Sequence, residues 1–160
     1  DLDIIQPLLD AYVQGEQYEK AEPLLDQVIA SLTEQRKMKD VVRFHHLRGK
    51  LREQLGNIEG ASEAYEMAHR LDATYIPNLL SLGKLKYNMQ DWDHALKLFQ
   101  TLLLHQMNMK EDDDKVEMYY YLGQIRVQTG DPRKAKDMFQ RALQIDGTHG
   151  PTLEAIQHVS

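Results

Sequence analysis

The sequence contains no cysteine, which excludes disulfides, thiolate zinc sites and a cysteine nucleophile. It also has no apolar run close to the roughly 18 residues of a membrane-spanning helix, so we expect no membrane insertion. Neither absence fixes the cellular compartment, because many exported proteins also lack cysteine; of the compartments left open, we favour the cytoplasm.

Proline and glycine are scarce as well. Five prolines and nine glycines among 160 residues are too few for a disordered or collagen-like chain, and the 28% of charged residues suits a helical protein. The net charge is −6, and Lys and Arg are spread along the whole length rather than gathered in a basic stripe. We therefore expect no nucleic-acid partner.

Sequence motifs for catalysis and nucleotide binding are missing. There is no G-x-S-x-G elbow, no G-x-x-x-x-G-K-[ST] loop and no G-x-G-x-x-G loop. Two of the seven histidines, His45 and His46, are adjacent and so point to different faces of a helix, and the others are scattered. We interpret the chain as a non-enzyme with no cofactor and no metal site.

One acidic run, Glu111 to Asp114, lacks the alternating ligands and central glycine of a calcium-binding loop. It precedes a segment with helical character. We interpret it as a helix start, where carboxylates cap free N–H groups and complement the helix dipole.

What the sequence does contain is a recurring register of small and aromatic residues. A glycine is followed by an alanine twelve residues later and by an aromatic residue four residues after that. Because two helices approach closely only where side chains are small, each copy predicts a helical hairpin whose aromatic residue fills the space beside the contact. The three copies are Gly49, Ala61 and Tyr65; Gly83, Ala95 and Phe99; and Gly123, Ala135 and Phe139.

An earlier segment keeps only part of this register. Ala21 is in place, but Leu9 stands where the glycine would be and Leu25 where the aromatic would be. Turn signals predict short hairpin loops. They are Gly15-Glu16-Gln17, Gly56-Asn57, Gln90-Asp91 and Gly130-Asp131-Pro132.

This pattern resembles the tetratricopeptide repeat family, whose consensus is W-x₂-L-G-x₂-Y followed by Ala, an aromatic, Ala and Pro. The matching residues are Leu82-Gly83, Leu122-Gly123, Ala68 and Ala142. The consensus Trp is replaced by His45, Leu79 and Tyr119, and the closing Pro by Ala73 and Gly147. The resemblance implies an all-α fold, a right-handed α-α superhelix of about four helical hairpins with a C-terminal capping helix.

The predicted repeats are 2–38, 41–73, 75–110 and 115–147, with a final helix at 151–159, which gives nine helices. Two repeats have six extra residues, which fall in Ser31–Lys39 and His105–Lys115 and predict a lengthened second helix and a longer connection. The segments from Val41 and from Lys115 align at an offset of 74 residues. We expect the sequence to be a piece of a longer protein.

The resemblance also implies a function, namely a protein-interaction scaffold whose first helices line a concave groove that holds an extended or helical peptide. Because Arg43, Lys50 and Lys84 recur on neighbouring first helices, we expect an acidic partner. Of the three consecutive tyrosines 119–121, we expect one in the core and Tyr120 in the groove. The groove residues that we single out are Arg43, His46, Lys50, Leu80, Lys84, Tyr87, Asn88, Tyr120 and Gln124.

Two other functions stay open from the sequence: a rigid spacer or self-association module within a larger protein, and an accessory domain of an enzyme whose catalytic part lies outside this chain. Some members of the family clamp a chaperone's C-terminal carboxylate with two Lys, two Asn and one Arg. The resemblance disfavours this mode, because the corresponding positions hold Gln6, Asp10, Leu47, Pro77 and Ser81.

Overall fold

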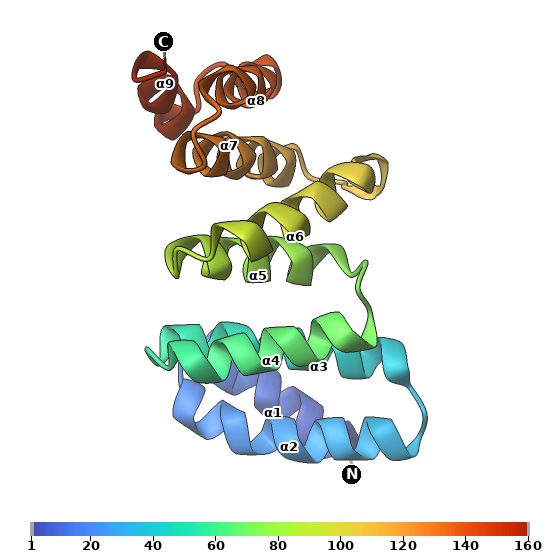
Figure 1. The fold of residues 1–160 in the computed structure, drawn as a ribbon. Helices are drawn as coiled ribbons and strands as arrows, with labels where there is room; N and C mark the ends of the chain where they lie inside the picture. Colours follow the sequence, from blue (N-terminus) through green and yellow to red (C-terminus); the bar gives the residue numbers. More distant parts are fainter. Residues whose placement is uncertain (1, 160) are drawn as a thin grey trace. The chain divides into compact units, whose positions relative to one another are not determined.

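The computed structural model describes residues 2–159, and within this range the chain is all-α, with nine α-helices, one short 3₁₀ helix and no β-strand (Figure 1). The predicted fold class and helix number are confirmed for this range. The helices are α1 (Leu2–Gln14), α2 (Tyr18–Glu34), α3 (Met38–Gln54), α4 (Ile58–Leu71), α5 (Ile76–Asn88), α6 (Trp92–Leu104), the 3₁₀ helix η1 (Gln106–Asn108), α7 (Asp112–Gln128), α8 (Pro132–Ile145) and α9 (Gly150–Gln157).

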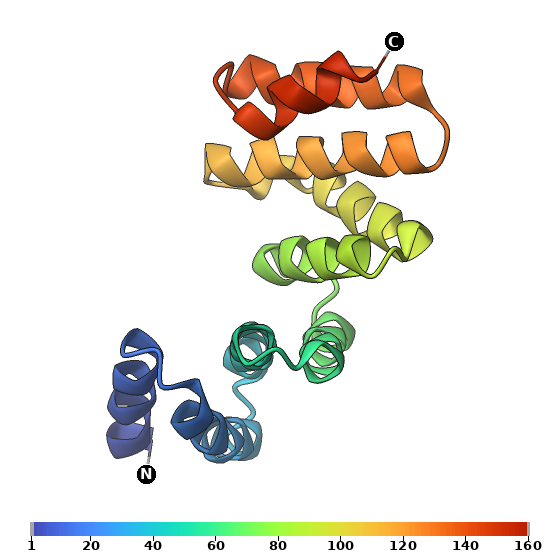
Figure 2. The same cartoon turned by 90° about the vertical axis from the view of Figure 1, so that its left-hand side faces the viewer.

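The chain forms two compact units, residues 1–78 and residues 79–160. The first unit contains α1 to α4 and the first turn of α5. The second contains the rest of α5 and all helices after it. Within the second unit, α8 runs antiparallel to α7 and α9 packs against both of them (Figure 2).

A glycine in one helix and an aromatic ring in the next make the closest contact in each of three hairpins. A Cβ atom built on Gly49 would lie 2.3 Å from the ring of Tyr65, and one on Gly123 would lie 2.4 Å from the ring of Phe139. Gly83 faces Phe99 in the same way, at 2.8 Å. All three rings are fully buried. The prediction of close helix contacts is confirmed, and the ring lies directly on the glycine.

The first hairpin solves the same packing problem with two leucines. Leu9 and Leu25 replace the glycine and the aromatic residue, and both are fully buried. Two leucine side chains of intermediate size thus replace the combination of a glycine, which has no side chain, and a large aromatic ring. This exchange keeps the helices packed without the glycine.

Turns of three residues join the helices of every hairpin, and each has its middle residue in the left-handed region. Gly56 and Gly130 have φ values of 76° and 79°, which glycine adopts at little cost. Glu16, Arg36 and Gln90 hold the same conformation at 56°, 56° and 61°. The four predicted turns are confirmed.

The turn at Arg36 was not predicted. It joins α2 to α3 through residues 35–37 alone, so the expectation of a longer connection there is wrong. The extra residues instead lengthen α2 and α3, each of which has 17 residues. As a result α3 begins at Met38, three residues before the predicted start of the second repeat.

The second insertion behaves differently. The helix α6 ends at Leu104 after 13 residues, so the predicted lengthening of the second helix is wrong here. The longer connection is confirmed, and it contains η1.

The acidic run lies at the start of α7 as expected, but Glu111 at the N-cap makes no side-chain capping hydrogen bond. The three aspartates of the first turn complement the helix dipole.

The offset of 74 residues extends over the whole chain. The helices α1, α2, α3, α4 and α5 begin at residues 2, 18, 38, 58 and 76, and α5, α6, α7, α8 and α9 begin at 76, 92, 112, 132 and 150. The turn before each closing helix also repeats, since Asp72 Oδ1 accepts from the backbone and hydroxyl of Thr74, and Asp146 Oδ1 does the same for Thr148. The chain is therefore built from a four-helix element of 74 residues.

We predict that Gly123→Ala lowers the free energy of unfolding by about 1–3 kcal/mol, because the new methyl group meets the buried ring of Phe139. Urea denaturation measures the change. Gly150→Ala is the matched control, since a Cβ there meets nothing within 4 Å. A leucine pair, Gly123→Leu with Phe139→Leu, should recover part of the stability that Gly123→Leu alone loses. Equal loss in the single and the double variant would contradict the exchange seen at Leu9 and Leu25.

We predict that Gln90→Gly raises the free energy of unfolding by ~0.5–1 kcal/mol, because glycine relieves the left-handed conformation at φ 61°. Gly130→Ala should lower it by about 1 kcal/mol for the converse reason. Thermal and urea unfolding of both variants test the pair. A stability loss for Gln90→Gly would show that the turn costs nothing in the native protein.

Candidate functional site

Two of the first helices of the first unit, α1 and α3, enclose a surface pocket of about 350 Å³. Three of the predicted groove residues, Arg43, His46 and Lys50, lie together in its wall on α3. Gln6 and Asp10 line it from the facing helix α1. The complete lining is Gln6, Asp10, Arg43, Phe44, His46, Leu47 and Lys50.

The pocket between α1 and α3 combines cations with an apolar floor. Arg43 is exposed and lies 3.9 Å from Asp40, a distance typical of a weak surface pair. Its guanidinium lies 5.1 Å from the centre of the buried Phe44 ring. Lys50 is exposed and forms no ion pair within residues 2–159. These groups suit a carboxylate that approaches over an apolar surface.

His46 stands between this pocket and the core. Its ring contacts the rings of Tyr65 and Tyr75, with centroids 5.7 and 5.8 Å away. Burial and the nearby Lys50 charge lower the pKa of His46 to about 4, although a hydrogen bond with the backbone of Pro77 opposes this shift. The imidazole is therefore neutral at neutral pH, and the positive charge of the pocket comes from Arg43 and Lys50.

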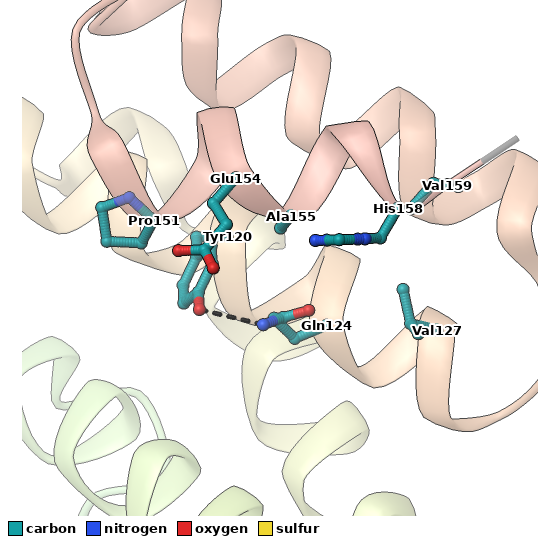
Figure 3. Close-up of a pocket in the computed structure, with 8 residues that line it drawn as sticks. All are labelled: Tyr120, Gln124, Val127, Pro151, Glu154, Ala155, His158 and Val159. Atoms are coloured by element: carbon teal, nitrogen blue, oxygen red, sulfur yellow. Dashed lines mark hydrogen bonds between the residues drawn. The ribbon is translucent and has the colours of Figure 1, made fainter.

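The second unit has a pocket of about 510 Å³ between α7 and α9 (Figure 3). Two predicted groove residues, Tyr120 and Gln124, form part of its wall, and the Gln124 Nε2 donates to the Tyr120 hydroxyl at 2.9 Å. None of the residues of α9 was among the predicted groove residues. The complete lining is Tyr120, Gln124, Val127, Pro151, Glu154, Ala155, His158 and Val159.

The three consecutive tyrosines of α7 separate as expected. Tyr119 is the one in the core, where 6% of its surface is exposed and its hydroxyl donates to Gln106 Oε1 at 2.7 Å. Tyr120 lines the pocket. Tyr121 stacks on the buried Phe99 at 5.5 Å, and burial raises the pKa of Tyr121.

The four predicted groove residues of α5 offer less to a partner. The Lys84 ammonium lies 2.9 Å from a Glu117 carboxylate oxygen, so its charge is already paired. Tyr87 packs edge-on against Trp92, at 5.2 Å between centroids. Leu80 has only 9% of its surface exposed, whereas Asn88 is exposed at the end of the helix.

The residues of the Lys84–Glu117 ion pair can be compared with the residues 74 positions earlier in the first unit. Lys84 corresponds to Asp10, and Glu117 corresponds to Arg43, so the signs are reversed. In the first unit Asp10 and Arg43 line an open pocket, whereas in the second unit the corresponding residues bridge α5 and α7. The sequence could not show this pairing, because the two partners lie 33 residues apart.

Within the described residues, no three or more His, Cys, Asp or Glu side chains are grouped so that they could hold a metal ion. None of the helices in residues 2–159 is both long and apolar enough to cross a membrane.

The chain is similar to proteins built from tetratricopeptide repeats. The sequence profile of this family matches residues 75–147. A tetratricopeptide repeat protein from Parabacteroides merdae superposes with a TM-score of 0.79 at 16% identity, covering 96% of this chain and 56% of that one. No curated protein sequence matches the chain at a significant level.

Two further solved structures have the same fold, one described as having a peptide-binding site and one with a bound peptide. YrrB, a TPR protein with an unusual peptide-binding site, gives a TM-score of 0.74 at 16% identity, over 96% of this chain and 73% of that one. The first TPR of Spaghetti (RPAP3), bound to the HSP90 peptide SRMEEVD, gives a TM-score of 0.65 at 11% identity. The superposition covers 74% of this chain and 89% of that one. At these identities the likeness shows the fold.

We predict that the protein loses stability as the pH falls from 6.5 toward 4, partly through His46. The pKa of His46 is about 4 in the folded chain and 6.5 as the ordinary value, so the unfolded chain binds the proton first. The neutral His46 therefore makes its full contribution to the free energy of unfolding above pH 6.5. At most about 3 kcal/mol of this free energy is lost by pH 4. NMR titration of the imidazole, with urea denaturation of the wild type and His46→Gln at each pH, measures it. An imidazole pKa near 6.5 in the folded protein would contradict it.

Proposed function

We propose that the chain is a protein-interaction scaffold that binds an acidic peptide segment through its first helices, in keeping with the match of residues 75–147 to the tetratricopeptide repeat profile. The observation that carries the proposal is the pocket between α1 and α3. There, two exposed cations, Arg43 and Lys50, lie beside the buried ring of Phe44. Hydrogen bonds between such cations and a carboxylate are stronger than neutral ones.

The peptide neighbours support this chemistry but not the same mode of binding. The HSP90 peptide in the RPAP3 complex, SRMEEVD, has three acidic residues. The family's carboxylate clamp needs Lys, Asn and Arg at positions that here hold Gln6, Asp10, Leu47, Pro77 and Ser81. We therefore propose that Arg43 and Lys50 bind Asp or Glu side chains within a peptide rather than its terminal carboxylate.

The charges in the pocket between α1 and α3 favour one side of it for a bound carboxylate. Asp10 on the facing helix repels an acidic side chain that approaches α1, so the favourable position lies nearer Arg43 and Lys50 on α3. His46 is neutral at neutral pH, so the attraction for the carboxylate comes from Arg43 and Lys50 alone. Binding of this kind weakens as salt screens the exposed cations.

We predict that Arg43→Glu with Lys50→Glu weakens binding of acidic peptides at least about tenfold, because two charge-assisted contacts are replaced by repulsion. A library of acidic peptides is first screened by fluorescence polarisation, alongside the same peptides with Asn and Gln in place of Asp and Glu. The best binder is then measured against the variant.

The matched control is Arg133→Glu with Lys136→Glu, which makes the same change in charge on exposed residues of α8. This control should keep the wild-type affinity. Equal loss in both variants would show a general effect of net charge, and full affinity in the Arg43 and Lys50 variant would overturn the assignment of this pocket.

A further inference from the structure

The pocket between α7 and α9 has the opposite electrostatic character to the pocket between α1 and α3. Its lining contains no Lys or Arg, and Glu154 supplies its carboxylate. The offset of 74 residues makes the contrast direct, because Tyr120 corresponds to His46 and Gln124 to Lys50. The cation on α3 is thus replaced by a neutral amide on α7.

The aromatic wall of this pocket is fixed in place. The Tyr120 ring packs edge-on against Tyr121 and His149, with centroids 5.3 and 5.7 Å away, and its hydroxyl accepts from Gln124. The imidazole of His149 is itself held by Thr152, at 2.7 Å between Nδ1 and Oγ1. A ring with this many contacts keeps one orientation, so its position in the pocket wall is set before any ligand arrives.

The carboxylate of Glu154 projects from α9 toward Tyr120, while Pro151 and Ala155 flank it on the same helix (Figure 3). A carboxylate next to an aromatic ring attracts a cation in two ways, by ion pairing and by the negative face of the ring. The apolar groups of Pro151, Ala155 and Val127 suit the methylene groups that carry such a cation in Lys and Arg.

We propose that the pocket between α7 and α9 binds an Arg or Lys side chain of a peptide partner. Glu154 pairs with the cationic group, Tyr120 contacts it through the ring, and the apolar residues cover the stem. The proposal rests on the peptide-binding function above and adds basic residues to the residue classes that the chain binds.

The test uses the full chain labelled with ¹⁵N and a small probe, N-acetyl-arginine amide. Chemical-shift changes should cluster at the Gln124 side-chain amide and at the backbone amides of Glu154 and Ala155, with a dissociation constant on the order of 1 mM. N-acetyl-citrulline amide, which has nearly the same shape without the charge, should cause no such shifts. Equal shifts with both probes would overturn the role of charge.

Glu154→Gln should weaken binding of the arginine probe about tenfold, because it removes the charge and keeps the shape. Glu111→Gln is the matched control, since this exposed residue makes no side-chain capping hydrogen bond at the start of α7. Unchanged binding in Glu154→Gln, or shifts away from α7 and α9, would overturn the proposal. The screen of acidic peptides against the Arg43 and Lys50 variant is independent of this pocket, so it separates failure here from failure of the proposed function.

Discussion

The contact between a glycine and a buried aromatic ring is the constraint on which the rest of this structure depends. It sets how closely the two helices of a hairpin approach, and its effect extends to the surface. In the first unit the ring on Gly49 is Tyr65, which in turn contacts His46 in the pocket wall. In the second unit the ring on Gly123 is Phe139, whose centroid lies 6.2 Å from that of Tyr120. The residue that shapes each pocket therefore rests on the residue that packs the core.

The four-helix element that repeats after 74 residues keeps the positions of its helices but not the charges on its surface. The helix starts and the Asp–Thr turns repeat, and so does one ring packed on glycine, Tyr65 on Gly49 and Phe139 on Gly123. The charges do not: Lys50 becomes Gln124, and the pair of Asp10 and Arg43 becomes Lys84 and Glu117. Surface positions on the first helices can change in this way because the glycine contacts, rather than these side chains, hold the hairpins together. One fold thus presents pockets of different charge.

Much of the fold could be predicted from the sequence, because the glycine, alanine and aromatic positions record the close contacts directly. Turns that contain Gly, Asn, Asp or Pro were also visible. The turn at Arg36 was not, because residues 35–37 contain no Gly, Asn, Asp or Pro, whereas the turns at Glu16 and Gln90 lie beside Gly15 and Asp91. The second insertion was predicted only in part, because six extra residues can extend either neighbouring helix or the connection.

The candidate site was predictable at the level of helix faces and less so at the level of single side chains. Helical periodicity brought Arg43, His46 and Lys50 to one face, and the structure places them in one pocket. The pairing of Lys84 depends on a partner in another helix, and the loss of exposure of Leu80 depends on tertiary packing. Glu154 was missed because the short final helix was interpreted as a cap, although its preceding Gly150-Pro151 matches Ile76-Pro77 at the offset of 74 residues.

The measurement that tests the central claim most directly is a map of backbone amide shifts as an acidic peptide from the screen is titrated into the labelled chain. Binding through the first helices predicts that the shifts in the first unit cluster on α1 and α3, around Gln6, Arg43 and Lys50. Shifts confined to the second helices α2 and α4 would contradict the account, because they would place the partner on the opposite helices of the hairpins.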